Sequence, residues 1–194
     1  TQDTAPTSQY VTATGGTITC SGDYRIHTFT GPGALCVSCA GNAAGSNTVE
    51  YLIVAGGGGG GKGCSHGSGA GAGGYRVSPA VPISVTSFPI VVGAGGAGAP
   101  ATPRFPGGDG NTSSFNSIAS TGGGGGVGWS TCAGRPGGSG SGAACSPNFN
   151  NFGAGNTPPV SPPQGNPGGS VTNAGNAMGG GGGAGEAGNT DGDR

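Results

Sequence analysis

The sequence has little charge and few large apolar residues. Only 7% of its residues are charged, and the formal net charge is −1. Leu, Ile, Val and Phe together account for 26 of the 194 residues, which is too few for an ordinary hydrophobic core. Disordered chains are also poor in large apolar residues but normally carry high charge. We therefore predict a chain that is ordered without a conventional core.

The scarcity of basic residues and of long apolar runs excludes two classes of partner. Nucleic-acid binding needs a basic face that neutralises phosphates, so we expect no nucleic-acid partner. A membrane-spanning helix needs roughly 18 or more consecutive apolar residues, and no run in the chain approaches that length. We therefore expect no membrane span.

Residues that carry catalytic or metal chemistry are also scarce. The only histidines are His27 and His66, and the seven carboxylates are scattered along the chain. A zinc set of Cys36, Cys39, Cys64 and His66 is disfavoured, because one residue separates the last two and a predicted strand lies between the pairs. We expect no enzyme activity, no cofactor and no metal site.

Glycine, by contrast, is abundant, with 51 residues, and it produces two motifs typical of nucleotide sites. Residues 56–62 match the phosphate-loop pattern G-x-x-x-x-G-K, but Gly63 stands where Ser or Thr must hold magnesium. Residues 93–98, GAGGAG, match G-x-G-x-x-G. Neither motif leads into a sequence that can form the required helix. We predict no nucleotide binding at Lys62.

Extended segments lead into glycine runs that begin at Gly56, Gly93, Gly122 and Gly179. A polyproline II helix has no internal hydrogen bonds, so its peptide groups can bond neighbouring segments. Glycine permits the close backbone approach that this packing requires, because it has no Cβ atom. We predict a helix-free fold, with a short N-terminal β-sheet region followed by a packed glycine-rich polyproline II bundle.

Three regions follow from this pattern. Residues 1–16 are polar and rich in Thr, which predicts an extended N-terminal arm. Residues 17–55 contain alternating β-branched and aromatic residues, which predict β-strands. Residues 56–194 hold the glycine runs, and we expect polyproline II segments joined by end loops there.

The cysteines are even in number in a chain that is short of core, which favours disulfides and an oxidising exterior. Free buried thiols are the alternative. The preferred pair is Cys132 with Cys145, which would close a loop around a glycine run. The six candidates are Cys20, Cys36, Cys39, Cys64, Cys132 and Cys145.

The order of several motifs resembles the glycine-rich domains of bacteriophage tail-fibre and related virion proteins, including those of marine cyanophages. The motifs are IHTFTGPGALCVS, VEYLIVAGGGGGG, GAGAGGYR, IVVGAGGAG, NTSSFNSIASTGGGGG and a final GGGGGAG. The chain is also similar in kind to the polyproline-II adhesins at the tips of T-even-like long tail fibres. The resemblance covers residues 17–190 and implies a rigid glycine scaffold whose end loops touch the host surface.

Aromatic and arginine side chains gather in the loops between the glycine runs, where a rigid scaffold can present them. Aromatic residues and arginine are enriched at binding hot spots. The alternative is that these side chains close the ends of the bundle as small satellite cores. The candidate receptor-binding residues are Arg104, Phe105, Trp129, Arg135, Phe149 and Phe152.

We therefore expect a non-enzymatic virion fibre or adhesin module on the particle surface, which recognises a host-cell glycan or protein. The alternative is a structural subunit that self-assembles into an extracellular filament or sheath, with residues 1–19 donated as a strand to a neighbour. Both readings predict contacts with other virion or filament subunits and a homo-oligomer. Loop aromatics exposed at a free tip favour adhesion, and loop aromatics buried between subunits favour assembly.

Overall fold

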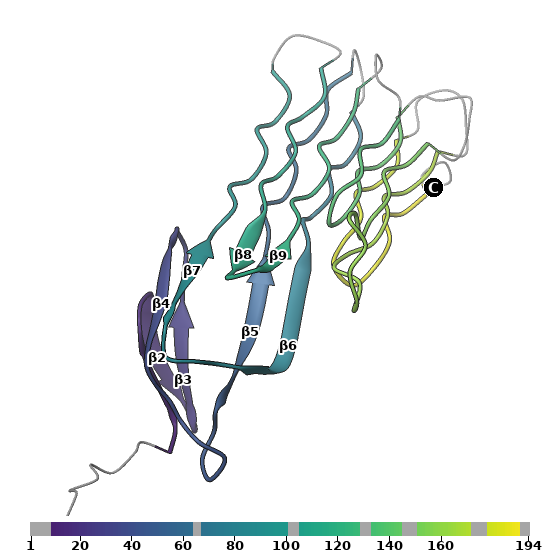
Figure 1. Cartoon of the computed structure of the whole chain (residues 1–194). Coiled ribbons are helices and arrows are strands. Elements are labelled where there is room, and N and C mark those ends of the chain that lie inside the picture. Colours follow the sequence, from purple (N-terminus) through teal and green to yellow (C-terminus); the bar gives the residue numbers. More distant parts are fainter. Residues whose placement is uncertain are drawn as a thin grey trace, which may run out of the picture. The chain divides into compact units, whose positions relative to one another are not determined.

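The structure is a computed structural model, and it describes residues 9–63, 67–100, 105–128, 133–144, 151–171 and 178–190 (Figure 1). Within these ranges the chain forms nine β-strands and no helix, which confirms the helix-free part of the predicted fold. The described residues accordingly offer no helix with the length and apolarity that a membrane crossing requires.

The strands form one five-stranded sheet in the order β1-β4-β7-β8-β9 and two sheets of two strands, β2-β3 and β5-β6. The pairs β1–β4, β2–β3 and β4–β7 are antiparallel. The strands are β1 (Val11–Thr14), β2 (Thr17–Ser21), β3 (Tyr24–Thr28), β4 (Gly33–Ala40), β5 (Thr48–Val54), β6 (Tyr75–Pro82), β7 (Ser87–Val91), β8 (Ser113–Phe115) and β9 (Ile118–Ser120).

The strands extend beyond residues 17–55 in both directions. β1 lies within residues 1–16, where the sequence predicts only an extended arm. Its sequence VTAT is polar but β-branched, which suits a half-buried strand, and it pairs with β4 and buries Ala13. β6 contains two prolines, which a two-stranded sheet tolerates because each strand keeps a free edge.

The chain divides into two compact units, and each is described by itself. The strand unit comprises Thr1–Leu52, Val77–Val91 and Phe115–Ser117. The glycine unit comprises Ile53–Arg76, Val92–Ser114 and Ile118–Arg194.

The strand unit has a small core of apolar side chains. Phe115 is 7% exposed, and its ring centroid lies 5.6 Å from that of Phe88 and 6.2 Å from that of Tyr51. Leu35 and Val37, two residues apart in β4, are also buried, as the alternation of a strand requires. Side-chain packing therefore holds this unit together.

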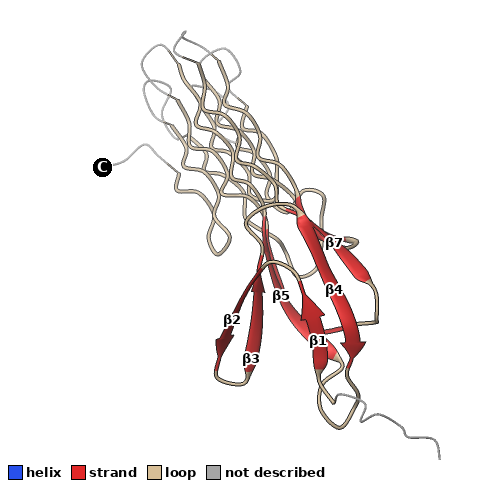
Figure 2. Cartoon of the chain, turned by 90° about the vertical axis from the view of Figure 1, so that its left-hand side faces the viewer, coloured by secondary structure: helices blue, strands red, loops and turns tan. Residues whose placement is uncertain are grey.

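The glycine unit consists mostly of extended segments that run side by side without strand pairing, drawn as tan tubes in Figure 2. Their backbone hydrogen bonds recur every third residue. The amides of residues 55, 58 and 61 donate to the carbonyls of residues 74, 71 and 68. The amides of residues 56, 59 and 62 donate to the carbonyls of residues 111, 108 and 105. One segment thus bonds different neighbours through successive residues.

Residues 121–127 form the most fully bonded segment. The amides of Gly123 and Gly126 donate to the carbonyls of Gly56 and Gly59 in one segment, and the amide of Gly124 donates to the carbonyl of Ser139 in another. Side chains accept three further amides: Gln164 Oε1 accepts the Thr121 amide, the Asp109 carboxylate accepts the Gly125 amide, and the Ser68 hydroxyl accepts the Val127 amide. Side-chain oxygens thus accept amides of this segment that no backbone carbonyl accepts.

In the glycine unit, glycine is needed mainly because it allows two backbone segments to approach closely. Among the described glycines only five have φ in the left-handed region. A Cβ added at Gly59 would overlap the carbonyl of Ala97, whereas one at Gly60 meets no described atom within 4 Å. Backbones therefore pack where side chains would normally lie, which accounts for the missing hydrophobic core.

Candidate functional site

The glycines of the phosphate-loop motif already use their amides within the fold. Gly56 and Gly59 donate to the carbonyls of Asn111 and Gly108, and Gly58 donates to the carbonyl of Gly71. A phosphate loop must instead aim such amides at the ligand. The amide of Lys62 likewise donates to the carbonyl of Phe105. The motif therefore builds a packing segment in the described structure.

Phe105 is one of three candidate binding residues that the structure describes. Its backbone carbonyl holds the Lys62 amide at 3.1 Å, so the position of the residue in the glycine unit is fixed. Its side chain is 52% exposed, which is unusual for a large aromatic residue. The ring is thus presented to solvent from an anchored backbone.

Phe152 is placed in a similar way. It is 37% exposed and precedes Gly153, whose amide donates to the carbonyl of Ser141 and whose carbonyl accepts the amide of Gly168. Hydrogen bonds to two segments thus fix the backbone beside the ring. The other candidates, Arg104, Trp129 and Phe149, lie outside the described residues.

Arg135 is held by an internal network. Its guanidinium donates to the Asp109 carboxylate at 2.5 Å and to the carbonyl of Gly107 at 3.1 Å. Its amide donates to the Ser141 hydroxyl at 2.7 Å. The other Asp109 oxygen accepts the Gly125 amide, so one carboxylate joins the arginine to the segment of residues 121–127. The guanidinium keeps an exposed face, since the side chain is 38% exposed.

No sequence motif points to Asp109, because it is a lone carboxylate between glycines. Gln164 was missed for the same reason. It is 1% exposed, its carbonyl accepts the Thr121 amide at 2.8 Å, and its amide group donates to the carbonyl of Pro158 at 3.0 Å. Both residues position loops that leave the glycine segments.

The described cysteines lie on two strands of the strand unit, Cys20 on β2 and both Cys36 and Cys39 on β4. Cys20 and Cys36 carry free, exposed thiols, and no disulfide joins either of them to Cys39. The Cys36 sulfur lies 3.5 Å from the Ser87 hydroxyl across the β4–β7 pair. The preferred pair of Cys132 with Cys145 lies outside the described residues, as does Cys64.

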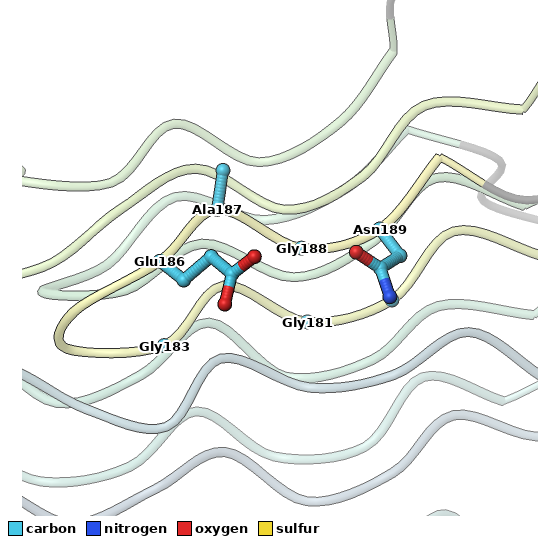
Figure 3. Close-up of a pocket in the computed structure, with 7 residues that line it drawn as sticks. Gly181, Gly183, Glu186, Ala187, Gly188 and Asn189 are labelled. Carbon is cyan, nitrogen blue, oxygen red and sulfur yellow. The ribbon is translucent and has the colours of Figure 1, made fainter.

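Metal and small-molecule features are sparse in the part of the chain that the structure describes. No group of three or more His, Cys, Asp or Glu residues there is placed to hold a metal ion. A shallow hollow of about 340 Å³ is lined by Gly180, Gly181, Gly183, Glu186, Ala187, Gly188 and Asn189. Figure 3 shows the Glu186 carboxylate and the Asn189 amide over this glycine backbone. The hollow is open and has one charged group, so it offers little to enclose a ligand.

No curated protein and no solved structure matches the chain. A family model described as "Glycine-rich domain" matches residues 38–194, which is most of the sequence and includes the whole glycine unit. That match agrees with a fold in which glycine segments pack through their backbones. The chain belongs to the glycine-rich domain family.

Proposed function

We propose that the glycine unit is a bundle of polyproline II segments. The observation that supports this is the three-residue recurrence of its hydrogen bonds, in which the amides of residues 55, 58 and 61 reach one neighbour and those of residues 56, 59 and 62 reach another. A polyproline II helix has three residues per turn, so every third peptide group points to the same side. In a β-strand, which repeats every two residues, every second peptide group would instead point to the same neighbour.

The function we propose is that of a non-enzymatic module of a virion fibre, which presents loops to a glycan or protein on the host-cell surface. The observation that carries this proposal is the anchoring of exposed side chains on a hydrogen-bonded frame. Phe105 and Phe152 expose aromatic rings, while backbone hydrogen bonds hold the peptide groups at or beside both positions. Likeness to phage fibre sequences supports the virion context.

The energetic reason is preorganisation. Binding through a mobile loop costs free energy for ordering, and a side chain fixed before binding avoids much of that cost. Aromatic rings suit this role because they supply large contact area and stack on sugar faces. Arg135 adds a cation whose orientation is set by Asp109.

The proposal is tested by the binding of the purified chain to intact bacteria and to arrayed bacterial surface glycans. We expect the Phe105→Ala and Phe152→Ala variants each to bind roughly 30-fold more weakly, as for loss of about 2 kcal/mol at a hot spot. The melting temperature is expected to change little, because both rings are substantially exposed. Tyr24→Ala, which removes a 62% exposed ring from the strand unit, is the matched control and is expected to leave binding unchanged.

Absence of binding to every cell and glycan tested would argue against an adhesin. A large fall in melting temperature for Phe105→Ala would show that the ring is a structural plug. Equal loss of binding in the Tyr24→Ala control would show that the receptor surface is not confined to the glycine unit.

A further inference from the structure

One segment of the glycine unit, residues 92–100, has an unpaired backbone edge. In Figure 1 it is the teal segment that continues from β7 along the margin of the unit. Among the described residues, its backbone hydrogen bonds reach two neighbouring segments: the amides of Gly96 and Ala99 donate to residues 57 and 60, and the carbonyls of Ala94 and Ala97 accept from residues 111 and 108. The central segment, residues 121–127, has bonded neighbours on more sides.

Two glycines of this edge segment leave their peptide groups unused. Neither the amide nor the carbonyl of Gly95 or Gly98 is hydrogen-bonded to any described residue, and both residues are exposed. They are three residues apart, which is the spacing at which bonded groups recur elsewhere in the unit.

Peptide geometry shows where these groups point. In a planar trans peptide, the N–H points away from the carbonyl of the preceding residue. Because the Ala94 and Ala97 carbonyls face one neighbour, the amides of Gly95 and Gly98 point away from that neighbour. Because the amides of Gly96 and Ala99 face the other neighbour, the carbonyls of Gly95 and Gly98 point away from it. The edge therefore offers a row of donors and a row of acceptors to solvent.

Gly95 and Gly98 are also not required to be glycine by backbone packing within one chain. A Cβ at Gly98 would meet no described atom within 4 Å, and one at Gly95 would make only an ordinary contact at 3.6 Å. At Gly93 and Gly96, by contrast, a Cβ would overlap a backbone carbonyl. Glycine at 95 and 98 thus leaves room for a further backbone to approach.

We propose that this edge pairs with the same edge of a second copy of the chain. The partner must bring backbone donors and acceptors at three-residue spacing without side chains in the way, and this edge itself meets that description. Having both donors and acceptors makes it self-complementary, as a two-fold interface requires. Residues 92–100 carry no charge, so two copies approach without repulsion.

A second margin of the glycine unit lacks these properties. Residues 186–190 expose the side chains of Glu186, Ala187, Asn189 and Thr190. Charged and bulky side chains are a usual way to block pairing at an exposed backbone edge. The bare edge at Gly95 and Gly98 therefore differs from this second margin. This inference does not depend on whether the loops bind a host.

Sedimentation equilibrium of the full chain over a range of concentrations tests the proposal. We expect a concentration-dependent dimer whose dissociation constant rises by about tenfold or more in Gly98→Lys, because the added side chain occupies the approach path. Gly185→Lys is the matched control, since its Cβ also meets no described atom within 4 Å but lies in the turn of the other margin. We expect this control to dimerise like the unmodified chain.

A monomer at all concentrations, or a dimer equally stable in Gly98→Lys, would overturn the proposal. Should Gly98→Lys fail to fold, amide hydrogen exchange of the unmodified chain decides instead. The amides of Gly95 and Gly98 should gain protection as concentration rises, while the amide of Gly96, already bonded within the chain, should not change. Equal exchange at Gly95 and Gly98 in dilute and concentrated samples would rule the interface out.

Discussion

Each of the two units is stabilised by a different part of the polypeptide: the strand unit by its side chains and the glycine unit by its backbone. In the strand unit, Phe115, Phe88 and Tyr51 pack their rings together, as in an ordinary small core. In the glycine unit the backbone itself is packed, and most buried side chains are small, such as Val127, Ala144 and Ser139, with Gln164 as a larger exception. Hydrogen bonds between segments there replace much of the apolar burial that normally stabilises a fold.

The comparison shows why the two units tolerate different substitutions. A side-chain core fails when side chains are removed, because a cavity remains. A backbone-packed core fails when side chains are added, because backbones cannot move apart without breaking several hydrogen bonds. The four predictions below test this difference, from the largest expected effect to the smallest.

Gly59→Ala is expected to abolish stable folding of the glycine unit. The added Cβ would overlap the Ala97 carbonyl, which is itself held by the Gly108 amide. Gly60→Ala is the adjacent control, with no described atom within 4 Å of the new Cβ, and it should unfold like the unmodified chain. Urea denaturation followed by circular dichroism measures both. Similar stability of the two variants would contradict backbone packing.

Phe115→Ala is expected to lower the free energy of unfolding of the strand unit by about 3–5 kcal/mol, through loss of burial and creation of a cavity. Tyr24→Ala removes an aromatic ring that is 62% exposed and should have little effect. Denaturation monitored at strand-unit amides by NMR separates this unit from the glycine unit. Equal stability of the two variants would show that Phe115 does not anchor a core.

Asp109→Ala is expected to destabilise the glycine unit by about 1–3 kcal/mol, because it leaves the buried amide of Gly125 without its acceptor. Asp109→Asn keeps an acceptor and removes only the exposed ion pair with Arg135, which is worth about 0–1 kcal/mol. Thermal unfolding of both variants gives the difference. If Asn is as damaging as Ala, the ion pair is the dominant contribution.

The smallest expected difference in stability is between alanine substitutions at two buried serines. The Ser139 hydroxyl donates to the carbonyl of Gly73 at 2.9 Å, so Ser139→Ala should cost about 1 kcal/mol. The Ser120 hydroxyl is buried without a hydrogen-bond partner among the described residues, so Ser120→Ala should be neutral or slightly stabilising. Denaturation midpoints compare them, and a larger loss for Ser120→Ala would reveal a partner outside the described residues.

Several features could be predicted from local sequence. The strand β5 and the extended backbone of residues 67–74 follow from an apolar β-branched run and from glycines that cannot sustain a helix. β1 could not be recognised, because its VTAT sequence becomes a strand only through pairing with β4. Residue type and loop position predict Phe105 and Arg135 as binding residues, but their different surroundings, one open and one tied to Asp109, depend on distant segments.

By itself, the sequence determined that the part of the chain now described has no helix and that glycines, rather than apolar side chains, carry the packing of the glycine unit. Both follow from intrinsic properties, the missing Cβ of glycine and the scarcity of large apolar residues. Only the tertiary structure decided which glycines are indispensable. Gly59 and Gly60 are neighbours in one run, yet one faces a carbonyl and the other faces open space. That difference arises because successive residues of the run meet different neighbouring segments, as the hydrogen bonds of Gly58 to residue 71 and of Gly59 to residue 108 show.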